Sequence, residues 1–298
     1  MEIYYENSKK KKISLSEWPI AIDDVTPLFA KKWEYELNEF RLKNKSELEQ
    51  MYRTTASIKL KIQIFADSRE EFEQITNDFQ EITEIDVLTG TEGKLWCNGY
   101  YMPCFIVADE AQDYEEDFYT VDSSIEILSI NPFWYKEQTK QFLPGTTSED
   151  TDGLDFPFDF EFDFAADQAG VAHWEIDHYT SSHFLMRIYG PCENPRILVN
   201  GYPYQVFTSL ASGDYLEINS RKNTVIKYLA NGTTENCYNS RLFYPRIFEK
   251  IPSGALTFNW SGAFGFDLIL YIERSEPKWG NKEETYIVSE SGKYIITE

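Results

Sequence analysis

The sequence predicts a mainly β protein in which a β-rich N-terminal domain carries one packed α-helix and the C-terminal domain is a β-sandwich. Three observations lead to this fold class. The 298 residues include 21 Phe, 20 Tyr and 7 Trp, and aromatic side chains favour the half-buried surface of a pleated sheet. One window in the first half has the period of a helix. Many short segments in the second half have the period of a strand and are separated by turn residues.

The first readable elements are a strand and a helix. Apolar residues alternate with polar ones from Ile58 to Ile64, which predicts a strand with one wet face. Ser68 and Glu71 then have the spacing of a capping box, which marks a helix start. Apolar residues recur every three or four positions from Phe72 to Ile82. We therefore expect a helix of about four turns that lays its apolar face on the neighbouring sheet.

A hairpin follows the helix. Leu95–Cys97 and Tyr100–Val107 flank Asn98-Gly99, a pair suited to a type I′ turn. The acidic strip Asp109–Asp117 predicts a loop, and Ser124–Ile130 predicts a further strand. Residues 1–55 mix aromatic and charged side chains without a clear period, so no element is predicted there.

Asn131-Pro132 ends this pattern, because proline lacks an amide donor and restricts the residue before it. Residues Gln138–Gly153 are rich in turn formers and predict a linker. The turn pairs Asn200-Gly201, Ser212-Gly213 and Asn231-Gly232 separate the later strands. Nine strands are expected beyond the linker, which favours a sandwich: Phe156–Phe164, His173–Asp177, His183–Tyr189, Arg196–Val199, Tyr204–Phe207, Asp214–Asn219, Thr224–Leu229, Ala255–Trp260 and Phe264–Glu273.

These segments predict a domain organisation of three parts. Residues 1–137 form the N-terminal domain and residues 138–280 form the sandwich. Residues 281–298 form a tail or an extra strand, for which Thr285–Val288 is the candidate.

The charge excludes several function classes. Fifty acidic residues against 28 basic ones give a net charge of −22, whereas binding to phosphates depends on Lys and Arg that displace counterions. We therefore expect neither sequence-specific nucleic-acid binding nor adhesion to an anionic membrane. No stretch approaches the roughly 20 apolar residues of a membrane-spanning helix, and the N-terminus does not have the pattern of a secretory signal.

Few side chains have the spacing of a metal or catalytic site. Cys97, Cys104, Cys192 and Cys237 lack a C-x-x-C pattern, so reduced and mostly buried thiols are expected. His173, His178 and His183 are five residues apart, and on one strand neighbouring histidines would face opposite sides. The spacing therefore disfavours chelation, although a turn between them would change the geometry.

The acidic stretch Glu149, Asp150 and Asp152 only partly matches a calcium loop, because Ser148 and Asp159 occupy the first and twelfth positions. A solvated linker is the preferred interpretation. No Ser motif and no pair of carboxylates stands out for catalysis. We predict no catalytic, cofactor-binding or metal-binding residue, no cofactor and no enzyme activity.

Two further features have both a structural and a functional interpretation. Trp174, Trp260 and Trp279 are candidates for stacking on a sugar, but core packing is the preferred role of the first two. The lysine run Lys9–Lys12 is interpreted as a solvated arm. Its alternative role is a bridge to an acidic face of a neighbouring copy.

The order of features in the C-terminal half carries a resemblance. A strand and turn at 195–201 precede Ser212-Gly213-Asp214-Tyr215-Leu216-Glu217-Ile218-Asn219. A tight return at Arg221-Lys222-Asn223-Thr224-Val225, a turn at Ile251-Pro252-Ser253-Gly254 and a long strand to Trp279 follow. Ile130-Asn131-Pro132-Phe133-Trp134-Tyr135 and Phe156-Pro157-Phe158-Asp159-Phe160 come earlier. Residues 57–279 thus resemble the distal tail proteins (Dit) of siphophages and of prophages in Gram-positive bacteria.

The resemblance implies a structural role. The N-terminal domains of six copies would form a ring around the tail channel, and galectin-like C-terminal sandwiches would project outward. Such a ring joins the tail tube to the tip protein, or tail-associated lysin, and to the baseplate or receptor-binding proteins. The chain would be made in the bacterial cytoplasm and would end up in the virion at the distal end of the tail, with DNA passing through the ring. Residues 1–55 and the acidic strip do not match the family pattern, so the ring interface is not assigned.

Two other functions remain open at this point. A galectin-like sandwich with many aromatic residues would also suit a carbohydrate-binding module for host cell-wall sugars, although fold alone is a weak reason for that function. An enzyme acting on cell-wall polymers has no motif to support it.

Overall fold

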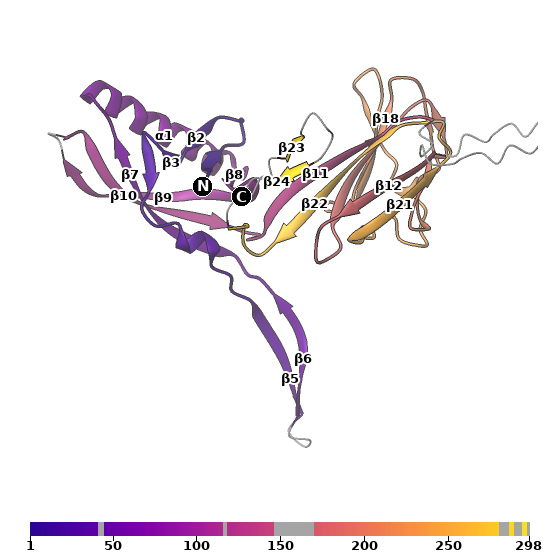
Figure 1. Ribbon diagram of the computed structural model, residues 1–298, viewed down its shortest axis with the longest axis horizontal. Helices are drawn as coiled ribbons and strands as arrows, with labels where there is room; N and C mark the ends of the chain where they lie inside the picture. The colour runs from indigo at the N-terminus through magenta and orange to yellow at the C-terminus, as the bar shows by residue number, and fades with distance from the viewer. Residues whose placement is uncertain (41–44, 116–117, 146–169, 280–285, 289–293, 297–298) are drawn as a thin grey trace, which may run out of the picture. The chain divides into compact units, whose positions relative to one another are not determined.

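The computed structural model describes residues 1–40, 45–115, 118–145, 170–279, 286–288 and 294–296. The chain divides into two compact units, one made of residues 1–135 with 273–298 and the other of residues 136–272. It passes from the first unit to the second within β11 (Trp134–Phe142) and returns within β22 (Phe266–Arg274) (Figure 1). Both units consist mainly of antiparallel strands, which confirms the predicted fold class.

The first unit is built around the long strand β9. One half of β9 pairs with β8, which continues the sheet through β1 to β2, and the other half begins the strand order β9-β10-β7-β4-β3. The elements are β1 (Ile3–Glu6), β2 (Lys12–Ser14), β3 (Ser16–Glu17), β4 (Ile20–Ile22), the 3-10 helix η1 (Thr26–Phe29), β5 (Glu34–Phe40), β6 (Lys45–Tyr52), β7 (Ala56–Phe65), α1 (Arg69–Thr89), β8 (Gly93–Cys97), β9 (Tyr100–Glu115), β10 (Thr120–Ser129) and the short pair β23 (Tyr286–Val288) and β24 (Tyr294–Ile296).

Helix α1 confirms the helical prediction and is longer than expected, because it runs over 21 residues. The Ser68 side chain accepts a hydrogen bond from the Glu71 amide, and the Glu71 carboxylate accepts one from the Asp67 amide, so the capping box is complete. Gly90 ends the helix in the left-handed conformation with φ of 62°. Phe79 and Ile82 are buried in the core of the first unit, and α1 lies beside β7 and β9 in Figure 1.

The predicted hairpin is confirmed, and the predicted acidic loop is wrong. Asn98 and Gly99 have φ values of 49° and 75°, as a type I′ turn requires. Strand β9 does not stop near Val107 but continues to Glu115 and pairs with β10. The sequence pattern fails here because both faces of this ribbon are exposed: hydrogen bonds between strands, rather than burial of one face, hold residues 109–115 in a strand.

The second unit has two main antiparallel sheets, beside the two-stranded pair β14–β17. The larger has the strand order β20-β19-β18-β13-β22 and the smaller has the order β12-β21-β15-β16. The elements of this unit not yet given are β12 (Gly170–Ile176), β13 (His183–Tyr189), β14 (Cys192–Glu193), β15 (Arg196–Val199), β16 (Tyr202–Gln205), β17 (Ser209–Leu210), β18 (Tyr215–Asn219), β19 (Thr224–Tyr228), β20 (Thr234–Asn236), the 3-10 helix η3 (Tyr238–Ser240) and β21 (Gly254–Trp260).

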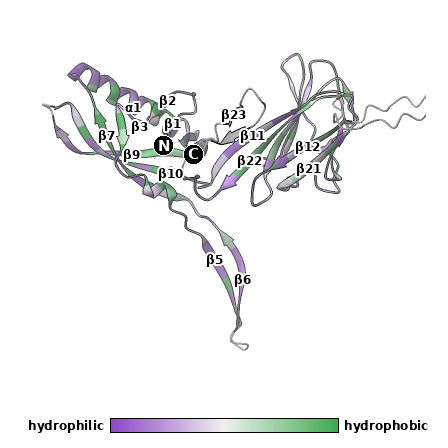
Figure 2. Ribbon diagram, in the orientation of Figure 1, coloured by the Kyte–Doolittle hydropathy of each residue, from purple (hydrophilic) through white to green (hydrophobic). Residues whose placement is uncertain are grey.

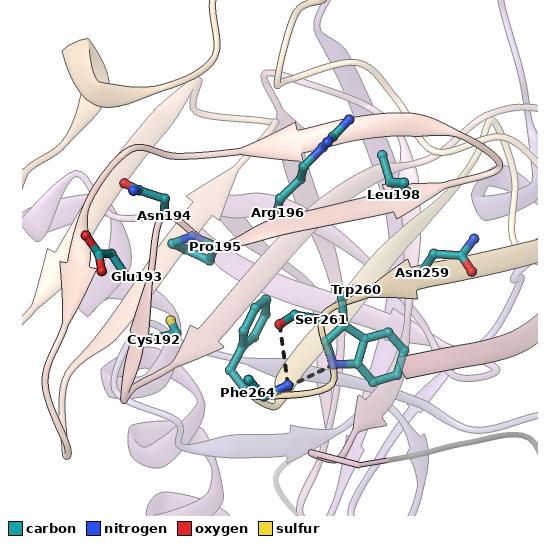
Figure 3. A pocket seen from close by; sticks show the side chains of 11 residues that line it. Cys192, Glu193, Asn194, Pro195, Arg196, Leu198, Asn259, Trp260, Ser261 and Phe264 are labelled. Atoms are coloured by element: carbon teal, nitrogen blue, oxygen red, sulfur yellow. Dashed lines mark hydrogen bonds between the residues drawn. The ribbon is translucent and has the colours of Figure 1, made fainter. Parts of the chain in front are cut away.

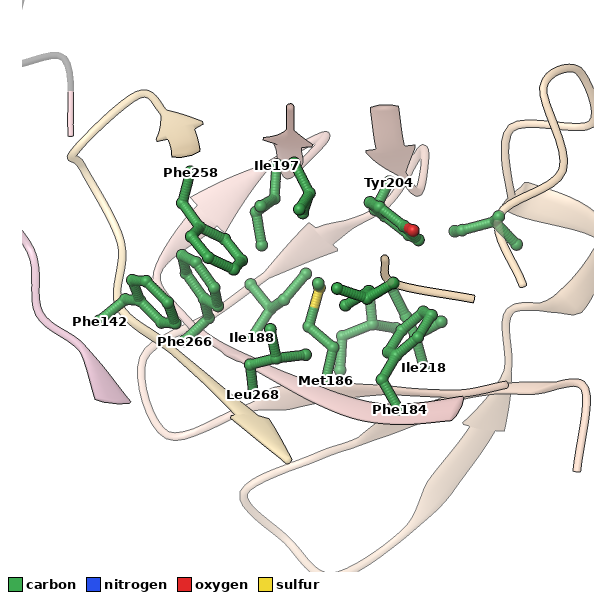
Figure 4. Close-up of a cluster of buried hydrophobic side chains, with 14 of the residues drawn as sticks. Phe142, Phe184, Met186, Ile188, Ile197, Tyr204, Ile218, Phe258, Phe266 and Leu268 are labelled. Atoms are coloured by element: carbon green, nitrogen blue, oxygen red, sulfur yellow. The ribbon is translucent and has the colours of Figure 1, made fainter. Parts of the chain in front are cut away.

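The core of the second unit lies between these two sheets. Figure 4 shows Met186 and Leu268, from β13 and β22, facing Ile197 and Phe258, from β15 and β21. Phe142, at the end of β11, stacks on Phe266 with ring centroids 4.3 Å apart. Alternate residues of each strand point into this layer, which is why the period of two was visible in the sequence.

Eight of the strands expected beyond the linker are present with small shifts of their ends, and the linker prediction is partly wrong. Residues 138–142 belong to β11 rather than to a linker. Phe142 is buried at the end of this strand. Because the residues before it are polar, the sequence shows no alternation of apolar and polar residues that would indicate a strand. The remaining linker residues 146–153 and the expected strand Phe156–Phe164 lie outside the described residues.

Candidate interaction surfaces

The three histidines are not brought together. His173 lies on β12 in the smaller sheet and His183 lies on β13 in the larger sheet, while His178 lies in the connection between them. The Nδ1 atoms of His173 and His183 contact the hydroxyl oxygens of Thr257 and Ser220 at 3.3 and 3.1 Å. No group of three potential metal-binding side chains occurs among the described residues. Glu149, Asp150 and Asp152 fall outside them.

All four cysteines are unpaired thiols. Cys97, Cys104 and Cys237 are buried and Cys192 is half-buried. Burial raises the pKa of each thiol, to about 11 for Cys97 and Cys192. Burial thus disfavours the thiolate, which is the form that acts as nucleophile and metal ligand, at all four cysteines.

The three tryptophans do not form a platform for a sugar. Trp260 is 5% exposed and donates its indole N–H to the Phe264 carbonyl oxygen at 2.9 Å. It borders the pocket of about 430 Å³ in Figure 3, but its ring belongs to the core. Trp174 packs against the same core. Trp279 stacks on Phe29 within the first unit, with ring centroids 3.7 Å apart.

The lysine run forms the turn between β1 and β2. The Asn7 side chain accepts hydrogen bonds from the amides of Lys9 and Lys11 and so fixes this turn. Lys10 and Lys12 make ion pairs with Glu6 at 3.0 and 3.6 Å. All four lysines are exposed, so the run is solvated as expected, but it forms an ordered turn rather than an arm.

Strands β5 and β6 form a two-stranded hairpin, here called the arm, which extends away from the sheets of the first unit (Figure 1). Tyr35 pairs with Met51 and Leu37 pairs with Leu48, and residues opposite each other in an antiparallel pair lie on the same face. All four side chains are exposed; Tyr35 and Met51 are each 61% exposed. The arm therefore has an apolar face that its own unit leaves uncovered.

The other face of the arm is polar. Glu36 faces Gln50, whose amide donates to the Glu36 carboxylate at 2.9 Å, and Figure 2 shows hydrophobic and hydrophilic residues mixed along both strands. An isolated two-stranded hairpin is marginal in water, and a contiguous exposed apolar patch marks an interaction site. The apolar face of the arm is therefore a candidate docking surface.

Sequence reasoning missed the arm. Trp33, Tyr35 and Leu37 do alternate with acidic residues, but a bulge between Glu36 and Leu37 shifts the register of β6. The apolar residues of β6 are consequently spaced by three, which hides the period of two.

The far end of the β9–β10 ribbon is an acidic surface of the first unit. Asp109, Glu110, Asp113 and Glu115 are all exposed there, and no lysine or arginine lies between Phe105 and Ser124. This end of the ribbon repels polyanions.

Solved structures with this architecture come from phage adsorption machinery. The crystal structure of the SPP1 Dit (gp 19.1) protein, described as a paradigm of the hub adsorption apparatus in phages that infect Gram-positive bacteria, has a TM-score of 0.60 and 7% identity. The alignment covers 92% of this chain and 98% of that chain. The chain has the fold of the SPP1 Dit protein.

Two structures of the phage P2 baseplate in its activated conformation each contain a chain that matches this one. With Ca the TM-score is 0.58 and with Sr it is 0.57, each at 13% identity over 93% of this chain and 99% of that chain. The predicted resemblance to the Dit family is thereby confirmed at the level of the fold. No protein-family model matches the sequence, and no curated protein matches it. No helix among the described residues is long and apolar enough to cross a membrane.

Proposed function

We propose that the chain is a structural subunit of a phage tail tip and that six copies form a ring through their first units. The shared fold with the SPP1 Dit protein and with a chain of the phage P2 baseplate supports this role. The observation that carries the ring is the arm, whose apolar face around Tyr35, Leu37, Leu48 and Met51 is uncovered within one copy. In a head-to-tail ring each arm would be covered by the next copy, since a heterologous contact that closes produces a cyclic assembly.

The roles proposed for the two domains follow the pattern of the Dit family. Residues 1–137 form the ring and residues 138–280 form a galectin-like sandwich that projects outward, with residues 281–298 as an added strand or tail. The ring would connect the tail tube to the tip protein or tail-associated lysin and to baseplate or receptor-binding proteins. Its place would be the distal end of the tail in the virion, after synthesis in the bacterial cytoplasm.

The net charge of −22 gives the ring a physical advantage. A channel wall of acidic side chains would repel DNA and let it slide through rather than bind it. An assembled ring whose lumen is lined mainly by Lys and Arg would rule out this part of the proposal.

Light scattering and negative-stain imaging of the purified chain test the ring. The expected result is a six-fold particle at high protein concentration.

The variant Tyr35→Lys/Leu37→Lys places two charges on the apolar face of the arm, and burying an unpaired charge is costly. We expect this variant to remain a monomer. Gln50→Lys, which adds a charge to the polar face of the same arm, is the matched control and should assemble like the unsubstituted chain. Equal assembly of both variants would show that the arm is not the ring contact.

A carbohydrate-binding module for host cell-wall sugars is the second candidate function. The tryptophans do not support it, but Phe243 and Tyr244 are exposed aromatic side chains at one end of the second unit. Retention of the chain by purified cell-wall material, measured by sedimentation, tests this function independently of ring formation.

A further inference from the structure

A hollow of about 440 Å³ lies at one end of the second unit, beside η3 and the segment that follows it. Its lining residues are Asn223, Tyr238, Arg241, Phe243, Arg246, Ile247 and Phe248. The floor is apolar, since Ile247 and Phe248 are buried members of the core. The rim combines arginine and aromatic side chains. No part of the arm contributes to this hollow, because the arm belongs to the first unit.

The aromatic rings of this region face solvent. Phe243, which lines the hollow, is 63% exposed, and Tyr244, the next residue in the chain but not part of the lining, is 91% exposed. Single exposed apolar residues are common, but neighbouring large rings beside a cavity mark a binding surface. Flat aromatic faces of this kind can cover the apolar face of a ligand ring.

Both arginines of the hollow are held in position by neutral groups. The Arg241 guanidinium lies 3.6 Å from the Tyr238 ring centroid and 4.3 Å from that of Phe243, and it donates to the Tyr238 carbonyl oxygen. Arg246 donates to the Asn223 side-chain oxygen at 3.1 Å. Aromatic rings and neutral oxygen atoms hold these side chains without neutralising the positive charge of either guanidinium. Because the side chains are already ordered, binding a ligand would cost less conformational entropy.

Neither Arg241 nor Arg246 forms an ion pair with a carboxylate of the described residues. This is notable in a chain with 50 acidic residues and 28 basic ones. Arg187, on β13 of the same unit, shows the usual arrangement, because it pairs with Glu217 at 3.1 Å.

Arg246 is one of the cations whose charges act on His183. Burial, followed by the charges of Lys250, Arg221 and Arg246, lowers the pKa of His183 to about 4. Arg246, which lines the hollow, therefore shares its surroundings with two further cations, Lys250 and Arg221.

We propose that this hollow binds an anionic saccharide, whose sugar ring stacks on Phe243 and whose phosphate or carboxylate group is held by Arg241 and Arg246. Arginine suits this role because its planar fork matches the oxygens of a phosphate or carboxylate. The volume is in the range of small-ligand sites. A saccharide fits better than an acidic peptide because the exposed rings offer flat faces beside the charges. This inference rests on the second candidate function and names its ligand class.

Chemical-shift titration of the full-length chain with three probes tests the inference: glucose 6-phosphate, glucose and inorganic phosphate. The titration extends to a probe concentration of about 10 mM. Of the three probes, glucose 6-phosphate should bind most tightly. Arg241→Gln and Arg246→Gln should each lower that affinity about tenfold. Phe243→Ala should weaken binding of glucose 6-phosphate more than binding of inorganic phosphate. Arg187→Gln is the matched control and should bind as the unsubstituted chain does.

Several outcomes would overturn the inference. The first is equal binding of glucose and glucose 6-phosphate, which would leave the carbohydrate-binding function standing without the anionic requirement. The second is no binding of glucose 6-phosphate at all. The third is tighter binding of a hexaglutamate peptide than of glucose 6-phosphate, which would make the hollow a protein contact. If the chain is retained by cell-wall material but binds none of the three small probes, the carbohydrate-binding function stands and the proposed site in this hollow is wrong.

Discussion

At the scale of single residues, the most constrained point of the first unit is the contact of Tyr5 with Asp86. Both side chains are fully buried. Asp86, near the end of α1, accepts hydrogen bonds from the Tyr5 hydroxyl at 2.7 Å and from the Ser8 amide at 2.9 Å. Burial, and next the hydrogen bond to Asp86, raise the pKa of Tyr5. This contact fixes the N-terminal strand β1 to the end of the helix.

Gly93→Ala is expected to destabilise the first unit, because the added Cβ would overlap the Tyr5 hydroxyl and the Asp86 carboxylate. Over-packing of a filled core site costs about 1–3 kcal/mol. Urea unfolding of the variant measures this loss. Thr91→Ala, an exposed substitution two residues away, is the control and should leave the free energy of unfolding within about 0.5 kcal/mol. A Gly93→Ala variant as stable as the unsubstituted chain would mean that the Tyr5–Asp86 contact moves freely.

At the scale of elements, local signals predicted α1, the β8–β9 hairpin and the strands of the second unit. Each of these has its information within a few residues: Ser68 with Glu71 at the helix start, or Asn98-Gly99 in a turn. The arm and the outer half of β9 have no such signal, because pairing with a partner strand, rather than burial of one face, keeps them extended. Elements without a buried face are the ones that a single sequence hides.

Ser68→Ala is expected to weaken the start of α1 by about 0.5–2 kcal/mol, because the Glu71 amide would lose its acceptor. Amide hydrogen exchange of residues 69–73 would report the loss locally, and thermal unfolding would report it globally. Gln74→Ala, on the exposed side of the same helix, is the comparison and should leave the exchange of this first turn unchanged. If Ser68→Ala leaves it unchanged as well, Glu71 alone is sufficient as the cap.

At the scale of the whole molecule, charge separates two kinds of surface. The chain is strongly acidic as a whole, and the end of the β9–β10 ribbon concentrates that charge in the first unit. In the second unit, Arg241 and Arg246 instead line one hollow without an ion pair to a carboxylate of the described residues. The composition predicts the sign of the total charge. The place where two arginines lie together depends on the fold, because they come from a loop without any sequence motif.

The chain is expected not to bind duplex DNA, because binding requires clusters of Lys and Arg that displace counterions. Fluorescence anisotropy with a labelled duplex at about 50 mM salt, where electrostatic binding is strongest, measures this. A basic protein of similar size serves as the positive control. A dissociation constant at or below about 1 µM under these conditions would contradict the proposal that the ring lets DNA slide through.

The sequence by itself determined the fold class, the one long helix, most strands of the second unit, the acidic character and the resemblance to the Dit family. These properties depend on composition, on periods of 2 and 3.6 residues and on short turn motifs, all of which are local. Only the tertiary structure showed the uncovered face of the arm, the extension of β9 and the grouping of Arg241 and Arg246 with Phe243. These three features depend on which strands pair and which side chains remain exposed. The register between strands that are distant in the sequence determines both.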